Sequence, residues 1–517
     1  MKRKLMLACM LAGTLAAQAQ GRFTIEGTLS GVDEGTVLGL YKDEGGVGTE
    51  VAVDTLRNGR FFFEGMTGSN EVEEYDVMAK DYGKLSPVWL SLWIGPDTHL
   101  KVKGENKLLK TWRVEGGSEC QRFQQQLVDA SRKELDAFQQ STMESMALGQ
   151  ALQNASGEQR ESIIAKLKQT QDEQDSLQRC VMANDIRLMK QSVVNKVWMN
   201  SLDGLGKMLK YDKEFPYRNE VKELYESLPD EWKNTEEGKS VYTALYPPVV
   251  VKDGEMAADG DLYDLQGKVH HLSDFQGKYI LLDFWSRGCG PCIQSQPELK
   301  EISELHKDSL EVVSLSIETK KGWEASVKNH PLAWNNWNDL QGRNGIAARY
   351  GVNGIPHFVL IAPDGHIVKS WVGYGPGLLK VQLRRWMRPQ PQTVYGTHEG
   401  NPTVDYPAYE TSNADALQIT QVERTDSATI LRIHAYYIPK FWIQLAKETH
   451  LVADDGTKCP VLRTEGLSLG KHFYMPESGE ADFTLYFAPL PASVKTFDFM
   501  EGDGNEAWRI NGIRVVE

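Results

Sequence analysis

The stretch that decides the fold runs from Tyr279 to Cys292 and reads Tyr-Ile-Leu-Leu-Asp-Phe-Trp-Ser-Arg-Gly-Cys-Gly-Pro-Cys. Its first residues form a β-branched and apolar run that is typical of a buried strand, and a tight turn follows. A helical apolar pattern continues beyond the second cysteine, with Ile293 and Leu299. We therefore expect a strand, a turn and a helix, with both cysteines at the N-terminus of the helix.

This position makes Cys289 and Cys292 the candidate reactive residues. Unpaired N–H groups and the positive end of the helix dipole stabilise an anion, so the leading thiol loses its proton more readily. The two-residue spacer places Cys289 at the exposed tip of the helix and Cys292 inside it. We expect Cys289 to attack a substrate disulfide as a thiolate and Cys292 to resolve the mixed disulfide. The disulfide between these two residues is then the redox centre, and we expect neither a metal nor a separate cofactor.

The segment resembles thioredoxin, and the match runs without a gap from Asp283 to Pro297. It continues through Tyr350-Gly-Val-Asn-Gly-Ile-Pro356 and through Phe358-Val-Leu-Ile-Ala-Pro-Asp-Gly365, and it covers about a quarter of the chain. The flanking sequence resembles the TlpA and ResA branch of exported thioredoxins, whose domains are AhpC/TSA-redoxin-like. The resemblance implies a thioredoxin fold and a thiol-disulfide oxidoreductase activity.

The resemblance also assigns roles to residues around the two cysteines. Asp283 matches a buried carboxylate beneath the second cysteine; burial would raise its pKa, so that it could take the proton of Cys292. Pro356 matches a cis-proline that presents the backbone of Ile355 to an extended substrate strand. The other substrate-binding residues that the resemblance implies are Trp285, Gly290 and Pro291. At Gly288 many relatives carry an aromatic residue, so contacts with substrate are expected to differ there.

The first 19 residues are typical of a secretory signal. Lys2-Arg-Lys4 precedes an apolar run from Leu5 to Ala17, and Ala17-Gln-Ala19 is a small-x-small cleavage site. We expect the mature chain to begin near Gln20 and to lie in the periplasm or cell envelope. No later stretch is apolar enough for a transmembrane anchor. The apolar stretch before Cys9 is too short for a lipoprotein signal, so lipidation there is the lesser hypothesis.

The net charge of the chain argues against some classes of partner, and its cysteine content argues against a fold built on disulfides. Without the three basic residues of the signal, 54 Lys and Arg face 71 Asp and Glu, so the net charge falls from −14 to −17. Such a chain repels nucleic acid and anionic lipid. Five cysteines remain, which is too few for a fold built on disulfides. Cys120 and Cys180 either bridge or stay as two buried thiols, and Cys459 has no obvious partner.

At 517 residues the chain is too long for one hydrophobic core, and we expect a multidomain α/β and all-β protein. Residues 20–115 alternate and turn often, and Asn58-Gly59 is a hairpin signal, which together predict an N-terminal β-sandwich. This part resembles a β-rich domain of unknown function that often precedes thioredoxin domains. Residues 116–248 follow a helical period and predict an α-helical region. The apolar positions that define its faces are Phe123, Leu127, Leu135, Phe138, Ile163, Leu167, Leu177 and Val181.

The remaining sequence predicts two further domains. Residues 249–388 alternate strand and helix patterns and hold the thioredoxin-like domain. Pro389-Gln-Pro-Gln indicates a linker over residues 389–408. Residues 409–517 return to β patterning and predict a C-terminal β-sandwich.

A Cys-x-x-Cys pair can also be half of a zinc site, which needs two more ligands. The sequence holds no second close pair of cysteines and no His-x-His spacing. We interpret His270, His271 and His357 as surface or packing residues rather than as ligands.

Exported thioredoxin folds act as reductases, or as oxidases and isomerases, according to their reduction potential. The Gly-Pro spacer resembles that of reducing thioredoxins, at about −270 mV, rather than that of oxidants at about −120 mV. We therefore favour a reductase, with an envelope oxidase or isomerase as the alternative. The resemblance implies a client protein with a disulfide or thiol, a membrane electron donor, and cytochrome complex assembly as the family's best-known setting. A second class of hypothesis is a binding or assembly protein in which the thioredoxin-like domain is secondary. It stays open because the other domains make up most of the mass of the chain.

Overall fold

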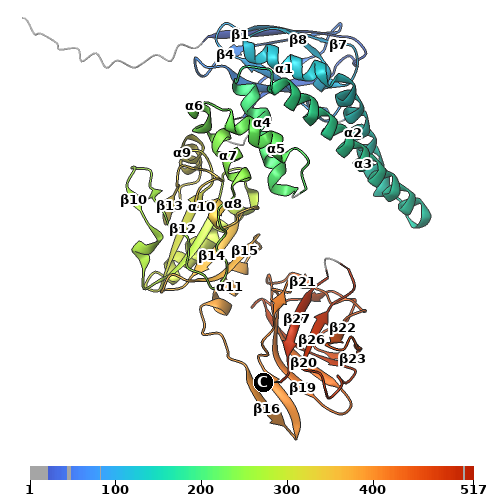
Figure 1. Ribbon diagram of the computed structural model, residues 1–517, viewed down its shortest axis with the longest axis vertical. Coiled ribbons are helices and arrows are strands. Elements are labelled where there is room, and N and C mark those ends of the chain that lie inside the picture. Colours follow the sequence, from blue (N-terminus) through green and yellow to red (C-terminus); the bar gives the residue numbers. More distant parts are fainter. Residues whose placement is uncertain (1–20, 44–47, 82, 213, 505–506, 517) are drawn as a thin grey trace, which may run out of the picture. The chain divides into compact units, whose positions relative to one another are not determined.

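The computed structural model describes residues 21–43, 48–81, 83–212, 214–504 and 507–516 (Figure 1). The chain divides into two compact units, residues 1–248 and residues 249–517. The expected signal segment 1–19, with Cys9, lies outside the described residues. Among the described residues, no helix has both the length and the apolar content that crossing a membrane requires.

The first unit begins with two four-stranded sheets that share one apolar core. The strand orders are β4-β1-β7-β8 and β3-β2-β5-β6. Alternate residues of β1, such as Phe23 and Ile25, are buried because successive side chains of a strand point to opposite faces. The strands are β1 (Arg22–Leu29), β2 (Val37–Asp43), β3 (Gly48–Thr55), β4 (Arg60–Met66), β5 (Glu73–Ala79), β6 (Leu90–Ile94), β7 (His99–Gly104) and β8 (Arg113–Gly116).

The turn at Asn58-Gly59 differs in part from the predicted hairpin. Both residues have positive φ, and Arg57 and Arg60 exchange both backbone hydrogen bonds, as in a two-residue hairpin turn. Strands β3 and β4 on either side of it nevertheless belong to different sheets. Leu56 and Phe61 are both buried in the core that the two sheets share, so the chain crosses from one sheet to the other here.

Helices make up the rest of the first unit. The two longest, α2 and α3, form an antiparallel hairpin (Figure 1). Phe123, Leu127 and Ile163 are buried as predicted, whereas Leu167 and Leu177 are only half-buried, because much of α3 is exposed to solvent. The helices are α1 (Glu119–Ala130), α2 (Arg132–Leu152), α3 (Gly157–Met189), α4 (Lys196–Tyr211), α5 (Arg218–Glu226), α6 (Asp230–Lys233) and α7 (Glu236–Leu245), with a short 3-10 turn, η1 (Leu109–Thr111), before them.

The second unit begins with a five-stranded mixed sheet of order β13-β12-β11-β14-β15. Strand β11 lies at its centre, parallel to β12 and antiparallel to β14. Ile280 and Leu282 of β11 belong to the core on one face and Leu281 to the core on the other, so a continuous apolar run is needed there. The elements are β9 (Leu262–Tyr263), β10 (Val269–His270), η2 (Leu272–Phe275), β11 (Tyr279–Trp285), α8 (Gly290–Leu305), β12 (Leu310–Ser316), α9 (Lys320–Asn329), β13 (Asn335–Trp337), α10 (Ile346–Arg349), β14 (His357–Ile361), β15 (Ile367–Val372) and α11 (Leu378–Trp386).

The last part of the second unit is a ten-stranded sheet around one core. Its order is β16-β17-β19-β20-β25-β23-β22-β26-β27-β18, and a separate two-stranded ribbon pairs β21 with β24. Leu431 of β20 and Phe499 of β26 lie in the same core although their strands are far apart in this order. The strands are β16 (Val394–His398), β17 (Asn401–Asp405), β18 (Thr411–Ser412), β19 (Leu417–Arg424), β20 (Thr429–Tyr436), β21 (Trp442–Ile443), β22 (His450–Ala453), β23 (Lys458–Glu465), β24 (Phe473–Tyr474), β25 (Glu480–Phe487), β26 (Thr496–Met500) and β27 (Arg509–Arg514).

The predicted linker 389–408 is wrong over most of its length. Residues 394–405 form the hairpin of β16 and β17, and β17 also pairs with β19. Val404 is buried in the C-terminal core, which gives this hairpin a packing contact that its polar and proline-containing sequence does not reveal. Residues 387–393 connect α11 to β16 without a helix or strand of their own.

Candidate active site

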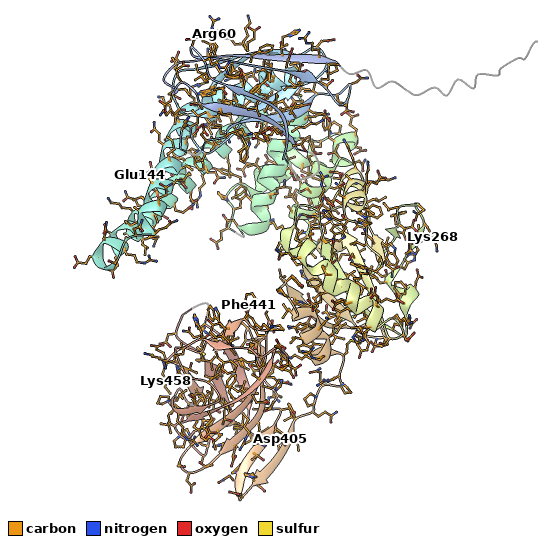
Figure 2. All side chains as sticks on the ribbon, turned by 180° about the vertical axis from the view of Figure 1, so that it is seen from behind. Arg60, Glu144, Lys268, Asp405, Phe441 and Lys458 are labelled. Carbon is orange, nitrogen blue, oxygen red and sulfur yellow. A yellow bond between two sulfur atoms is a disulfide. The ribbon has the colours of Figure 1, made fainter. Side chains whose placement is uncertain are left out.

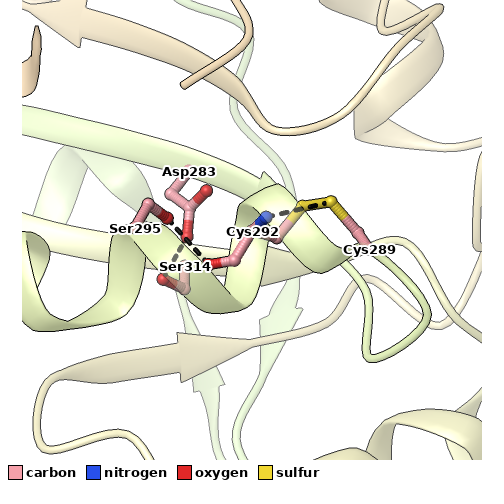
Figure 3. The surroundings of a disulfide bond; sticks show 5 residues. All are labelled: Asp283, Cys289, Cys292, Ser295 and Ser314. Atoms are coloured by element: carbon pink, nitrogen blue, oxygen red, sulfur yellow. Dashed lines mark hydrogen bonds between the residues drawn. A yellow bond between two sulfur atoms is a disulfide. The ribbon is translucent and has the colours of Figure 1, made fainter. Parts of the chain in front are cut away.

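Cys289 and Cys292 lie where strand β11 gives way to helix α8, as the sequence predicts, and they form a disulfide (Figure 3). Cys289 is the N-cap residue of α8, and its sulfur accepts a hydrogen bond from the Cys292 N–H at 3.1 Å. Pro291 fits the first turn because its missing N–H has no intrahelical partner at that position. The sulfur of Cys289 therefore sits at the positive end of the helix dipole.

The exposure of Cys289 is lower than the sequence predicts. The residue is only 9% exposed, against 1% for Cys292, although it is placed at the tip of the helix. Ile293, Leu332 and Ile355 pack around the pair and cover it. The order of accessibility is as expected, but Cys289 presents only a small part of its surface to solvent.

Trp285 is fully buried against the two cysteines, which corrects its expected place in substrate binding. It ends strand β11, where its ring supports the disulfide from within the domain. Gly290 and Pro291, by contrast, are exposed beside the disulfide, where a substrate can touch them.

Asp283 lies two residues before Trp285 in β11 and is buried. In Figure 3 its side chain is beside the first turns of α8, near Cys292 and Ser295. One carboxylate oxygen accepts a hydrogen bond from the Ser314 hydroxyl at 2.8 Å, and the other has no hydrogen-bond partner. Loss of hydration raises the pKa of this carboxyl to about 7, and the Ser314 bond offsets only part of that effect.

Two residues that the sequence does not single out complete the surroundings of Asp283. Ser314 of β12 pairs with Asp283 in register, and its hydroxyl also accepts the indole N–H of Trp334 at 2.9 Å. A signal for Ser314 is present in the sequence, because it is a polar residue inside the apolar run that forms β12. Trp334 has no such signal, since it comes close only through the fold.

The peptide bond between Ile355 and Pro356 is cis, as the resemblance implies. Ile355 is half-buried and packs against the disulfide, so this loop and the cysteines border the same surface. The Pro356 carbonyl accepts a hydrogen bond from the Gly373 N–H at 2.8 Å, which connects the loop to the end of β15.

Glu298 in the third turn of α8 is another residue that sequence reasoning misses. It is buried, and its carboxylate accepts hydrogen bonds from the Tyr374 hydroxyl and from the backbone N–H groups of Gly377 and Lys380, at 2.8 to 3.0 Å. The last two groups belong to the N-terminal end of α11. Glu298 thus ties the reactive helix to the loop that follows β15.

The three histidines considered as zinc ligands each have a local partner. His270 contacts Asp264 at 2.9 Å and stacks on Trp337, and His271 contacts Asp261 at 3.0 Å. His357 is buried beside the Ser370 hydroxyl, and burial lowers its pKa to about 4. In the part of the chain that the structure describes, no cluster of three or more His, Cys, Asp or Glu side chains suits a metal ion. The remaining cysteines of that part, Cys120, Cys180 and Cys459, are free thiols. Cys120 is half-buried and Cys180 is exposed, so this pair neither forms a bridge nor consists of two buried thiols.

Comparison with known proteins places this site in a family. Residues 277–367 match the model of a thioredoxin-like family. The thiol-disulfide oxidoreductase ResA of Geobacillus thermodenitrificans is 29% identical over 139 residues, which are 26% of this chain and 79% of that protein. ResA of Bacillus thuringiensis subsp. konkukian is 32% identical over 122 residues, 23% of this chain and 69% of that protein. A solved structure of a thiol:disulfide interchange protein DsbE from Chlorobium tepidum is 30% identical, with a TM-score of 0.24, over 26% of this chain and 96% of that one.

The match to the family model spans the strand, the turn with Cys289 and Cys292, and the helix described above. Both cysteines are present and paired in the structure. The chain therefore belongs to the thioredoxin superfamily, among the ResA-like and TlpA-like thiol-disulfide oxidoreductases, and it is a protein disulfide oxidoreductase.

Proposed function

We propose that the protein is exported and that it reduces disulfides of client proteins through Cys289 and Cys292. The observation that carries this proposal is the place of Cys289 at the N-cap of α8, where its sulfur accepts the Cys292 N–H. The same N–H and the helix dipole stabilise a thiolate on Cys289 once the disulfide is reduced. The dithiol is the redox centre, and the reaction needs no separate cofactor in this proposal.

The reaction has two exchange steps. The Cys289 thiolate attacks one sulfur of the client disulfide, which forms a mixed disulfide and releases the other client sulfur as a thiolate. Cys292 then transfers its proton to Asp283 and attacks the Cys289 sulfur. The Cys289–Cys292 bond forms, the bond to the client breaks, and two electrons have passed from the enzyme to the client.

Asp283 suits the proton transfer because of its burial. A carboxyl whose pKa is about 7 is partly ionised at neutral pH, so it can accept a proton and release it again. Ser314, held by the Trp334 indole, fixes the orientation of the carboxylate. The carboxyl is thus a base of suitable strength in a dry site.

The direction, location and partners of the reaction are also part of the proposal. The Gly290-Pro291 spacer supports a reductase, because it resembles the spacer of reducing thioredoxins. The signal-like residues 1–19 support export to the periplasm or cell envelope. An oxidising compartment does not regenerate a dithiol, so we infer a membrane-bound electron donor, and the resemblance to the TlpA and ResA branch supports clients in cytochrome assembly.

Reduction of insulin disulfides in the presence of dithiothreitol tests the activity. The wild-type protein should accelerate the precipitation of the insulin B chain, and Cys289→Ser should abolish the acceleration. Cys180→Ser is the matched control, because Cys180 is an exposed free thiol far along the chain from the site, and it should leave the rate unchanged. A Cys289→Ser protein as active as the wild type would contradict the proposal.

The redox midpoint potential, measured by equilibration with glutathione or dithiothreitol, tests the direction. A value near about −270 mV supports a reductase, whereas a value near about −120 mV would make the protein an oxidant and contradict this part of the proposal.

A further inference from the structure

The carboxyl of Asp283 is the end of a short chain of hydrogen bonds that begins at Trp334. The Trp334 indole donates its N–H to the Ser314 hydroxyl at 2.9 Å, and this hydroxyl donates to Oδ2 of Asp283 at 2.8 Å (Figure 3 shows the second bond). Ser314 and Asp283 are both buried. Among the residues that the structure describes, none forms a hydrogen bond with Oδ1 of Asp283. The two oxygens of the carboxyl therefore have different surroundings.

The direction of these hydrogen bonds follows from the groups involved. An indole N–H can only donate, whereas a hydroxyl carries one proton and two lone pairs. Because Trp334 donates to the Ser314 oxygen, the hydroxyl gives its own proton to Asp283. A hydroxyl that donates in this way favours the ionised carboxylate over the neutral acid. Without the indole, the hydroxyl could also turn and accept a proton from the neutral acid.

Trp334 is held in place by the strand that follows it. Strand β13 begins at Asn335 and pairs in parallel with β12, where Asn336 lies opposite Ser314. The Asn335 side chain also donates to the Val312 carbonyl at 3.3 Å. The half-buried indole packs against the apolar core between the sheet and α8. Its N–H is therefore presented to Ser314 by an ordered part of the sheet.

The segment that carries Trp334 also contacts the redox centre. Leu332, two residues earlier, packs against the cluster formed by Trp285 and the two cysteines. One short segment between α9 and β13 thus reaches the disulfide through Leu332 and the carboxyl of Asp283 through Ser314. Trp334 acts on the carboxyl only through the hydroxyl, so its role is to position another group.

Charged side chains contribute little to the surroundings of Asp283. Helix α8 packs on the same face of the sheet and brings two buried titratable side chains, Cys292 and Glu298, of which Glu298 is bonded to α11. On the neighbouring strands, His357 and Glu311 pair in register with core residues of the opposite face. Helix α11 contributes leucines to the core on the side of Asp283.

The pKa of Asp283 reflects these surroundings. Burial raises it to about 7, and the hydrogen bond from Ser314 is the cause that lowers it. Charged side chains farther out, such as Lys268 in Figure 2, are exposed to water, which screens them. A change in the bonding of Ser314 should therefore alter the pKa of Asp283 more than a change in surface charge.

We propose that Trp334 is a positioning residue for the proton transfer, and that it holds the Ser314 hydroxyl as a donor to Oδ2 of Asp283. The proton released by Cys292 then binds to Oδ1. The S–H bond of Cys292 breaks, an O–H bond forms at Oδ1, and the sulfur attacks Cys289 while the bond to the client breaks. The inference rests on the proposed function, because it assumes that Asp283 accepts this proton.

Infrared titration of the Asp283 carboxyl tests the inference in the full-length, oxidised protein. The C=O stretch of the protonated carboxyl is followed against pH, and the spectrum of the same protein with Asp283→Asn is subtracted, so that the other carboxyls cancel. Trp334→Phe should raise the pKa of Asp283 by about 0.5 to 1 unit, because the neutral acid gains an acceptor. Ser314→Ala should raise it by about 1 to 2 units, because the ionised form loses its hydrogen bond.

Trp371→Phe is the matched control for the loss of an indole. Trp371 packs against the same apolar core as Trp334, but its N–H is buried without a hydrogen-bond partner among the described residues. This variant should therefore leave the pKa of Asp283 unchanged. A retained near-ultraviolet circular dichroism signal shows that Trp334→Phe is folded, and Ser314→Ala tests the same chain of hydrogen bonds without any change in an aromatic ring.

The rate of resolution gives a second measurement. A peptide whose single cysteine is activated with thionitrobenzoate forms the mixed disulfide with Cys289, and quenched flow with mass spectrometry follows its resolution by Cys292. Relative to the wild type, Trp334→Phe should resolve it about three- to tenfold more slowly at pH 6, where a raised pKa leaves less carboxylate, and at nearly the same rate at pH 9. The release of thionitrobenzoate in the first step should be unchanged at both pH values.

The two measurements separate the inference from the proposed function. A pKa of Asp283 that stays constant or falls in Trp334→Phe, or that rises equally in Trp371→Phe, would overturn the inference. A raised pKa without any effect on resolution would support the action of Trp334 on the carboxyl and contradict only the proposed role of Asp283 as the base.

Discussion

Burial and hydrogen bonding set the pKa of Asp283, the residue proposed to accept the proton of Cys292. Its pKa rises from 3.8 to about 7 in the folded protein, so between these pH values the folded chain holds a proton that the unfolded chain releases. The contribution to stability is complete below about pH 4 and is lost as the pH rises through about 7. The dry site therefore costs folding stability under the conditions in which the carboxylate serves as a base.

Replacement of Asp283 by asparagine should make the oxidised protein more stable at high pH. The amide keeps the shape and can keep the Ser314 contact, but it never ionises. A pKa difference of about three units corresponds to about 4 kcal/mol, so Asp283→Asn should gain up to that amount at pH 8 and almost nothing at pH 4. Urea unfolding of wild type and variant at both pH values measures this, and an equal difference at both would contradict the assignment.

The same substitution should slow the second exchange step and spare the first. Without a carboxylate to take the Cys292 proton, the mixed disulfide should persist, with a loss of about 100-fold in the rate of its resolution. Quenched-flow trapping and mass spectrometry of the client adduct separate the two steps. Ser295→Ala, which removes a hydroxyl bonded only to the Cys292 carbonyl, is a nearby control that should leave both rates intact.

For single residues, the sequence predicts those features that depend on neighbouring positions in the chain. Cys289 and Cys292 follow from the local motif, because one strand and one turn place them, whereas the roles of Asp283 and Pro356 come from the resemblance to thioredoxins. The low exposure of Cys289 does not follow, since the side chain of Leu332 that helps to cover it comes from a distant segment. For the same reason Trp285, which the resemblance implies among the substrate-binding residues, proves to be interior.

Among the elements, α8 and α11 depend on one carboxylate. Glu298→Ala leaves two backbone N–H groups of α11 and the Tyr374 hydroxyl without their acceptor, which should cost about 2 to 4 kcal/mol in the free energy of unfolding. Glu298→Gln retains an acceptor oxygen and should cost about half as much. Thermal unfolding compares the three proteins, and an Ala variant as stable as the wild type would show that these bonds contribute nothing net.

A helix or strand can be predicted from the sequence when the interactions that stabilise it are visible in its own residues. Strand β11 is apolar apart from Asp283 because both of its faces are covered, and this is visible in the sequence. The turn at Asn58-Gly59 is equally local, but the separation of β3 and β4 beyond it depends on which of the two sheets each strand joins. The hairpin at 394–405 could not be predicted from its own residues. Its strand β17 pairs with β19, which lies further along the chain, and this pairing holds the hairpin in the C-terminal sheet.

For the whole molecule, the reduction of one bond should affect one unit. The Cys289–Cys292 disulfide lies in the unit of residues 249–517, and the first unit has its own cores. Scanning calorimetry should show more than one transition, and dithiothreitol should lower the midpoint of only one of them. Cys289→Ser should remove this sensitivity, whereas a shift of every transition would contradict the independence of the units.

The domain organisation is predictable in outline because periodicity changes at the domain boundaries. The pattern of apolar residues changes along the chain from the alternation typical of strands to a helical period, and then to a mixture of strand and helix patterns. The contacts that join the C-terminal sheet to α11, such as Arg384 with Glu480, are between residues 96 positions apart and leave no local trace. Their effect is a property of the assembled unit.

The short connection from α11 to β16, residues 387–393, has a consequence for how the two parts of the second unit meet. Because so few residues join them, the ten-stranded sheet cannot diffuse away from the thioredoxin-like domain, and contact between the two is an intramolecular event. Short tethers give effective concentrations on the order of millimolar. Weak contacts such as that of Arg384 with Glu480 are therefore made far more often than they would be between separate molecules.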